Sequence, residues 1–282
     1  MAGLRLKVWL GIAVFAAAVA ALLAGREALL DGDRIHIEVE RSQRLARAAQ
    51  GLAQEGTPDL KDLAGRLSAH GLAAGAPVFI RIFKREFELE LWMKRDDRFH
   101  RFAVYPICRW SGRLGPKLLE GDAQAPEGFY AVDSKALNPA SRWHRSFNLG
   151  FPNRFDRAHH RTGSFVMVHG GCSSVGCYAM TDAVVEEIWH LVTAALKGGQ
   201  ARFPVHIFPF RMTQENLAQR SHHTWAAFWR DLKRGHDAFE ETQLPPKISV
   251  CQGRYAVSPA APGSDGSHEI GDRCPPASGV GS

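Results

Sequence analysis

Hydrophobic residues along the chain follow two spacings, and the change between them comes near residue 77. From Pro77 onward apolar and polar residues mostly alternate, which is typical of half-buried strands. The expected strands are Val78–Phe83, Phe87–Met93, Phe102–Cys108, Phe129–Val132, Ser164–His169 and Pro204–Phe210. With helical spacing on either side of this region, the pattern predicts a mainly β domain with flanking helices, an α+β fold.

Helical spacing predicts three helices. They are one opened by Thr57 as N-cap, one over Ala183–Lys197 after a cap at Thr181 or Asp182, and one over Thr224–Arg234. The last carries three large aromatic residues at helical spacing, which we expect to form a packed face rather than a sugar platform: Trp225, Phe228 and Trp229.

The N-terminus has the pattern of a targeting segment. Arg5 and Lys7 precede Val8–Ala24, which contains no charged residue. A basic start before an apolar stretch is typical of a signal peptide, and at this length an uncleaved anchor in the inner membrane through residues 8–24 fits equally well. A buried helix of a soluble protein is the less favoured alternative. We therefore expect a periplasmic or cell-envelope protein.

These patterns predict five segments. They are a signal peptide or signal anchor (1–25), a helical spacer (26–76), the β-rich main domain (77–212), a C-terminal helical extension (213–257) and a disordered tail rich in Pro, Gly and Ser (258–282).

The formal net charge of +6 adds a limited constraint on partners. It suits an anionic surface such as a membrane or an acidic cell-wall polymer. Lys and Arg are spread along the chain and no nucleic-acid-binding motif accompanies them, so we expect no nucleic acid as partner.

The chain has five cysteines, Cys108, Cys172, Cys177, Cys251 and Cys274. An exported protein meets an oxidising compartment, in which two pairs would leave one thiol free. The spacing does not determine which cysteines pair.

The stretch VMVHGGCSSVGCYAMTD contains His169, Cys172 and Cys177 at the end of an apolar run. A zinc site would use these three, with His159 and His160 upstream, but no second ligand pair accompanies them and we expect no metal. A disulfide between Cys172 and Cys177 fits an exported protein and would block any nucleophile there.

The third interpretation of the stretch is a thiol nucleophile with a histidine base. Thiolate is the reactive form of cysteine, and an imidazole or a favourable backbone field is needed to populate it at neutral pH. Gly176 lets the backbone approach a substrate, and a helix is expected a few residues after Cys177, so amide hydrogens can converge there. His169, at a strand end before a Gly-Gly turn, can face the same pocket.

The motifs around this stretch resemble those of the YkuD-type L,D-transpeptidases. His169-Gly170 followed by Ser174-Val-Gly-Cys177 resembles the family's H-G turn and S-x-G-C segment. The upstream motifs G-x-K, G-D and T-P-x-G-x-Y have similar counterparts in Gly115-Pro-Lys117, Glu120-Gly-Asp122 and Ala125-Pro-Glu-Gly-Phe-Tyr130. The compact form H-G-x-C-x-S-x-G-C-Y-A-M-T, preceded by Asp156-Arg-Ala-His159, is similar to the YafK-like branch. The resemblance covers residues 77–212 and implies the family's β-sandwich or barrel-like catalytic domain.

The resemblance implies a role for each matching residue. Cys177 would attack a peptide carbonyl in the stem of peptidoglycan and form a thioester, with His169 as general base and then acid. Ser174, Gly176 and Gly170 would belong to the oxyanion and substrate-binding wall. No cofactor is implied, and the partner would be peptidoglycan or a wall-linked peptide or protein.

One departure from the family pattern concerns substrate binding. The commoner form has an Arg soon after the cysteine, whereas Tyr178 follows here. Lys117, Arg157 and Arg161 are candidates to contact substrate, the two arginines through carboxylates. We expect Cys172 to be a packing residue or a thiol close to the site.

The fate of the thioester is left open by the sequence. An amine acceptor would make the protein a transpeptidase, and water would make it an amidase or peptidase. A non-enzymatic alternative is an inert wall-binding module in which Cys172 and Cys177 are oxidised to each other.

Overall fold

The computed structural model describes residue 15 and residues 32–274. The expected signal peptide or anchor over residues 1–25 lies, apart from residue 15, outside this described part. Within the described part, no helix combines the length and the apolar character needed to cross a membrane.

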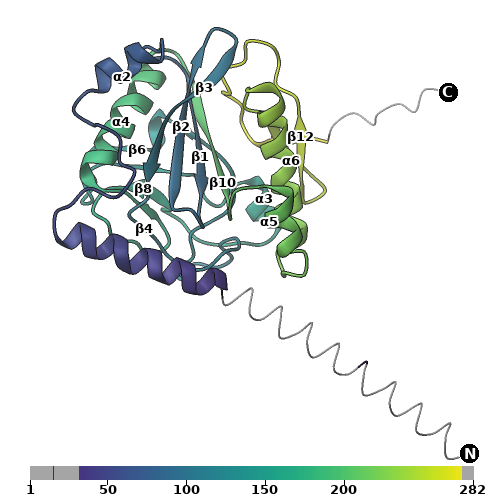
Figure 1. The fold of residues 1–282 in the computed structure, drawn as a ribbon. Coiled ribbons are helices and arrows are strands. Elements are labelled where there is room, and N and C mark those ends of the chain that lie inside the picture. The colour runs from purple at the N-terminus through teal and green to yellow at the C-terminus, as the bar shows by residue number, and fades with distance from the viewer. Residues whose placement is uncertain (1–14, 16–31, 275–282) are drawn as a thin grey trace, which may run out of the picture.

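The central element is a five-stranded sheet in the order β3-β2-β1-β10-β5 (Figure 1). Its strands are β1 (Val78–Phe83), β2 (Glu88–Arg95), β3 (Arg98–Pro106), β5 (Gly128–Asp133) and β10 (Arg202–Phe208). Only the β1–β10 pair is parallel. All six residues of β1 are buried, as expected of a strand covered on both faces.

A second five-stranded sheet is built from short strands in the order β4-β9-β8-β7-β6. Its strands are β4 (Arg109–Trp110), β6 (Leu137–Asn138), β7 (Ser146–Asn148), β8 (Met167–His169) and β9 (Tyr178–Ala179). The 3-10 turn Ser134–Ala136 and helix α3 (Arg154–Ala158) lie in the connections between these strands. With two sheets and several helices, the expectation of an α+β fold is confirmed.

Helix α4 (Asp182–Lys197) joins the two sheets, because it packs against β1 and β10 of one and β8 of the other. Thr181 is its N-cap, with a side chain that accepts a hydrogen bond from the amide of Val184. The helix expected from Thr57 begins later: α2 spans Leu63–Ala69 and is capped by Asp62. That expectation of the starting residue was therefore wrong.

A helix over residues 32–49 runs along the lower edge of the molecule in Figure 1. Its guanidinium groups attach it to the main domain: Nε of Arg41 donates to the carbonyl of Trp110 (3.0 Å) and Nη1 of Arg44 to that of Ile107 (3.2 Å). This segment therefore packs on the β-rich domain instead of standing apart from it.

The C-terminal region contains helices α5 (Gln214–Gln219) and α6 (Ala226–Thr242) and a three-stranded sheet. The strands of this sheet are β11 (Lys247–Cys251), β12 (Arg254–Ser258) and β13 (Gly271–Asp272). The expected disordered tail is thus wrong for residues 258–274, where β13 pairs with β11 and a Cys251–Cys274 disulfide closes the sheet.

Tyr255 attaches this sheet to the rest of the protein, although its strands β11 and β12 lie mostly in the segment expected to be helical, residues 213–257. The tyrosine is buried, its ring stacks on Phe155 at 4.1 Å, and its hydroxyl accepts from Nδ2 of Asn153 at 3.0 Å. The packed aromatic face expected for the preceding helix is also observed, with Phe228 and Trp229 buried.

A buried ion pair between Lys84 and Glu127 connects the central sheet to the loop that precedes β5. The Lys84 ammonium, directly after β1, donates to Glu127 Oε1 (2.9 Å) and to the carbonyls of Arg113, Gly115 and Ala125. The other oxygen of Glu127 accepts from Nε1 of Trp229 at 2.8 Å. Burial lowers the pKa of Lys84, against the opposing effect of Glu127.

We predict that Lys84→Met lowers the free energy of unfolding by roughly 3–5 kcal/mol, because it leaves the carboxylate of Glu127 buried without its cation. Chemical denaturation measures the loss. The double variant Lys84→Met/Glu127→Gln, which removes both charges, should cost less than the sum of the two single changes. Lys61→Met, at an exposed lysine, is the matched control, and an equal loss in both lysine variants would contradict the prediction.

Candidate active site

Strands β8 and β9 bring the expected nucleophile and base to one face of the second sheet. His169 ends β8, and the parallel register pairs it with Ala179 of β9. Cys177 stands two positions before Ala179, so alternation of side chains places Cys177 and His169 on the same face. Both side chains line one cavity of about 400 Å³.

The thiol of Cys177 is the only free one among the cysteines of the described residues, and it is half-buried. Its Sγ accepts from the amide of Met167 (3.4 Å) and lies 3.8 Å from the carbonyl oxygen of Phe165. Burial raises the pKa of the thiol, while the Met167 amide and the Lys117 charge act in the opposite direction. The resting cysteine is therefore a neutral thiol near pH 7.

The imidazole of His169 is oriented by the next residue. Its Nδ1 lies 2.6 Å from the carbonyl oxygen of Gly170, and because a carbonyl can only accept, Nδ1 carries the hydrogen and Nε2 is the acceptor. Burial lowers the pKa of His169, the Gly170 contact opposes this, and the charge of Arg142 lowers it further. At neutral pH the ring is thus an uncharged base with Nε2 open to accept a proton.

Two glycines allow the backbone to make the turn between His169 and Cys177. A Cβ on Gly170 would come 2.5 Å from Oδ1 of Asp182 and 2.9 Å from the carbonyl oxygen of Trp143, so a side chain does not fit. Gly176 has a φ of +101°, a conformation that other residues rarely adopt. These contacts explain the two glycines of the motif in structural terms.

Serine hydroxyls accept hydrogen bonds from backbone amides of the turn that ends at Cys177. The amide of Cys177 donates to Oγ of Ser174 at 3.0 Å, and the same hydroxyl donates to the carbonyl of Cys177 at 2.7 Å. The amide of Gly176 donates to Oγ of Ser111. Both amides therefore shape the wall of the site in this arrangement, and an oxyanion would have to displace a serine hydroxyl to use either one.

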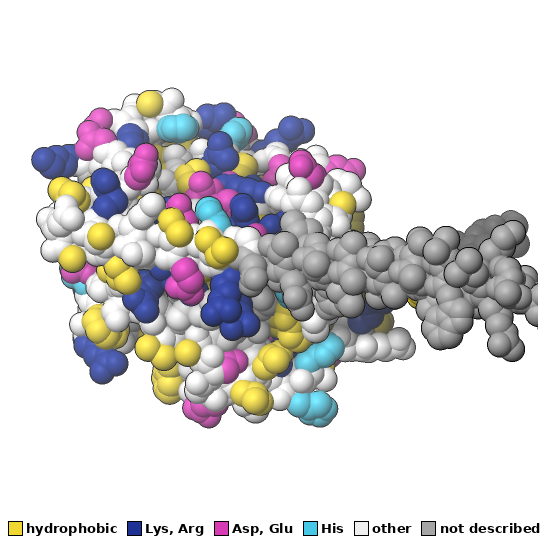
Figure 2. Space-filling view, turned by 60° about the horizontal axis from the view of Figure 1, so that its bottom comes forward, with side chains coloured by type: hydrophobic (Ala, Val, Ile, Leu, Met, Phe, Trp, Pro, Cys, Tyr) yellow, Lys and Arg dark blue, Asp and Glu magenta, His cyan; other side chains and the backbone are white. Residues whose placement is uncertain are grey.

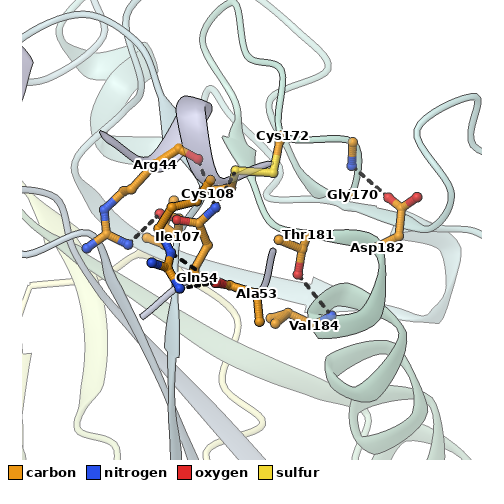
Figure 3. Close-up of a disulfide and its surroundings, with 12 residues drawn as sticks. Arg44, Ala53, Gln54, Ile107, Cys108, Gly170, Cys172, Thr181, Asp182 and Val184 are labelled. Atoms are coloured by element: carbon orange, nitrogen blue, oxygen red, sulfur yellow. Dashed lines mark hydrogen bonds between the residues drawn. A yellow bond between two sulfur atoms is a disulfide. The ribbon is translucent and has the colours of Figure 1, made fainter. Parts of the chain in front are cut away.

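Cys172 forms a disulfide with Cys108, which lies between β3 and β4 (Figure 3). The interpretations of Cys172 as a packing residue or a nearby free thiol, and of its pairing with Cys177, were therefore wrong. The disulfide links Cys172 to a segment 64 positions earlier in the chain. It therefore fixes the loop between His169 and Cys177. It also removes Cys172 as a metal ligand, and among the described residues no cluster of three or more His, Cys, Asp or Glu could hold a metal.

The three basic residues proposed for substrate contact have other partners. Lys117 is buried and bonded to Asp122 and to the carbonyl of Leu119, although its charge still acts on Cys177. Arg161 is buried in an ion pair with Asp156 (2.8 Å). Arg157 is exposed and donates to the carbonyl of Pro152.

Sequence reasoning missed the residues that form the rest of the cavity wall. Arg142, Trp143 and Ser146 come from the stretch before and within β7, and Phe165 and Val175 flank the nucleophile. Phe165 is 75% exposed with a φ of +53°, and Val175 is 81% exposed. The exposed Arg-Trp pair in a polar stretch was the one available signal for these residues.

Comparison with known proteins identifies the family of the chain. The model of the YkuD L,D-transpeptidase catalytic domain matches residues 79–207. Over 184 residues the chain is 47% identical to the protein named "Putative L,D-transpeptidase YafK" in Escherichia coli K12, and equally to that of strain O157:H7, covering 65% of this chain and 75% of each relative. The chain belongs to the YkuD family of L,D-transpeptidase catalytic domains.

Solved structures give a weaker likeness. The helical cell shape determining protein Pgp2 (K307A mutant) from Campylobacter jejuni is 19% identical, with a TM-score of 0.40, over 65% of this chain and 66% of that one. Bd1075 from Bdellovibrio bacteriovorus is 19% identical, with a TM-score of 0.34, over 60% of this chain and 62% of that one.

We predict that replacing both Cys108 and Cys172 by Ser lowers the free energy of unfolding by roughly 2–4 kcal/mol, because the disulfide closes a long loop of the unfolded chain. Thermal denaturation measures the loss. The same substitutions should also slow acylation of Cys177 by substrate, because the loop that places this thiol relative to His169 is then less well held. The pair Cys251→Ser/Cys274→Ser is the matched control, and it should affect stability but leave Cys177 reactivity unchanged.

We also predict that alkylation of Cys177 by iodoacetamide keeps accelerating as the pH rises past the ordinary cysteine pKa of 9.0, because the folded protein raises the pKa of this thiol. Lys117→Met should slow the reaction at a given pH, since it removes a charge that lowers that pKa; Lys61→Met is the control. A rate that is already maximal around pH 7 would instead show a thiolate–imidazolium pair and contradict the prediction.

Proposed function

We propose that the protein is a cysteine-dependent acyl-transfer enzyme that acts on peptidoglycan stem peptides through a thioester on Cys177. The observation that carries the proposal is the placement of the free thiol and the Nε2-accepting imidazole on one face of β8 and β9, in one cavity. Membership of the L,D-transpeptidase family supports the substrate class.

The chemistry proceeds in two halves. Nε2 of His169 takes the thiol proton as Sγ of Cys177 attacks the carbonyl carbon of the donor peptide, and the resulting imidazolium gives that proton to the departing amine. The products of this half are a thioester and a free amine. In the second half an acceptor loses its proton to His169 and attacks the thioester carbonyl, and the imidazolium then returns that proton to the departing thiolate.

The acceptor decides between two activities of this site. An amine acceptor forms a new amide, which is transpeptidation, and water releases the acid, which is hydrolysis. We propose transpeptidation first because it is the reaction for which the family is named. Amidase or peptidase activity on the same acyl-enzyme is the second candidate, since Cys177 is partly exposed and water can therefore reach it.

The inert wall-binding module is less well supported. It required Cys172 and Cys177 to be oxidised to each other, whereas Cys172 pairs with Cys108. The face in Figure 2 shows Lys and Arg interspersed with Asp, Glu and apolar side chains, so this face offers no continuous basic surface for an anionic polymer.

The cell envelope is the compartment that suits this activity. The substrate of a cell-wall enzyme lies outside the cytoplasm, and two disulfides among the described residues fit an oxidising environment. We propose a periplasmic location, with residues 8–24 as a cleaved signal or an inner-membrane anchor.

The test is mass spectrometry of muropeptides after incubation of the full chain with peptidoglycan, alongside Cys177→Ala and His169→Ala. We expect Cys177-dependent new cross-links or exchanged terminal residues, and a decrease of about a hundredfold or more in the rate of acylation by His169→Ala, because general base catalysis is lost. Cys177-dependent release of peptides without exchange would identify a hydrolase. Products that do not depend on Cys177 would exclude the proposed mechanism.

Control measurements separate chemistry from folding. Circular dichroism and thermal denaturation should give the same folded state for the wild type, Cys177→Ala and His169→Ala. Normal acylation by a folded His169→Ala variant would show that another group serves as base.

A further inference from the structure

The catalytic cavity contains a buried hydroxyl that has no partner within the protein. Ser146, on β7, stands opposite His169 in the antiparallel register, so its side chain lies on the same face as the imidazole. The residue is 1% exposed, its Oγ makes no hydrogen bond with the described residues, and it lines the cavity that holds Cys177. A buried hydroxyl without a partner is costly, so this one points to a ligand.

A cation without an acidic partner lines the same cavity. Arg142 is the only permanently charged side chain among the described residues of this wall, and no hydrogen bond or ion pair with the described residues involves its guanidinium. By contrast, the neighbouring Arg145 is paired with Glu186. The guanidinium of Arg142 lies instead over the indole ring of Trp143, 5.3 Å from its centroid.

Trp143 fixes this part of the wall relative to the catalytic histidine. Its carbonyl accepts from the amide of Gly170 at 3.0 Å, and its ring centroid lies 6.0 Å from that of His169. Arg142 is therefore attached through its neighbour to the turn that carries the base. The charge of Arg142 lowers the pKa of His169, which agrees with this proximity.

We propose that Arg142 and Ser146 form a subsite for a carboxylate of the acyl-donor peptide, in the cavity that contains Cys177 and His169. The guanidinium supplies charge and paired N–H donors, and the hydroxyl supplies one further donor, which together satisfy a carboxylate. The apolar side chains of Phe165 and Val175 in the same wall suit an aliphatic stretch between that carboxylate and the scissile amide.

This inference rests on the proposed function, since it names the group of the donor peptide that the same site binds. Two carboxylates of a stem peptide have the required chemistry, the one at the chain terminus and one on a side chain near the scissile bond. Their recognition uses the same donors, and selective amidation distinguishes them.

The test measures equilibrium binding to the full chain carrying Cys177→Ala, which cannot form the thioester. The probes are a synthetic stem peptide with free carboxylates, the same peptide amidated at its terminus, and the same peptide amidated at the side chain. Arg142→Gln and Ser146→Ala are added in this background, with Arg98→Gln as the control for loss of one exposed positive charge outside the cavity.

We expect Arg142→Gln to weaken binding of the free peptide by about tenfold, as loss of a charge-assisted contact should. Amidation of one carboxylate should weaken binding to the parent chain by a similar factor and abolish the further effect of Arg142→Gln; the peptide that behaves this way identifies the carboxylate. Arg98→Gln should bind like the parent. Ser146→Ala should weaken binding while leaving the thermal stability unchanged or slightly higher, because it removes an unpaired hydroxyl.

Equal binding of the free peptide by the parent chain and by Arg142→Gln would overturn the subsite and leave the proposed function intact. Equal binding of the free and both amidated peptides would do the same. If the parent chain bound none of the peptides and the wild type did not process them, the substrate class itself would be wrong, and the subsite with it.

Discussion

The pairing of the Lys84 ammonium with the Glu127 carboxylate is the interaction on which the rest of the site depends. The ammonium also donates to three loop carbonyls, and the carboxylate accepts from the indole N–H of Trp229. This buried cluster fixes the loop before β5 against the central sheet. That loop supports the strand that follows Cys177, because the hydroxyl of Tyr178, the next residue, donates to the carbonyl of Pro126 at 2.6 Å. A charge pair far inside the protein thus determines where a half-exposed thiol stands.

The electrostatics of the site suit the proposed mechanism, in which the cysteine is activated only when substrate arrives. Burial acts on both partners in the direction that disfavours charge, raising the pKa of Cys177 and lowering that of His169. In the proposed reaction, proton transfer between them therefore becomes favourable as the sulfur forms its bond to carbon and no longer carries the full negative charge. Such a resting state also protects the thiol from oxidants, since oxidation proceeds through the thiolate.

The alternation and spacing rules were sufficient for the long elements and insufficient for the irregular ones. Val78–Phe83 is found as β1 and the helix after Thr181 as α4, because each buries a continuous apolar face that the local sequence displays. The C-terminal strands were missed since their order comes from distant groups, Tyr255 inserted beside Phe155 and the Cys251–Cys274 bond. In the site, the motif predicts that Cys177 and His169 converge. No sequence motif or spacing marks Arg142 and Ser146. They can be recognised as part of the site only once β7 is known to pair with β8.

The Cys108–Cys172 bond has a consequence for how the protein matures. Along the chain the nearest thiol to Cys177 is that of Cys172, and in an unfolded chain entropy favours closing the shortest loop. The native bond instead spans 64 positions, so its formation is favoured once folding has brought Cys108 beside the glycine-rich turn. Once formed, the Cys108–Cys172 bond makes the thiol of Cys172 unavailable for a disulfide with Cys177. Correct oxidation of one cysteine is thereby the condition that keeps the other one reduced.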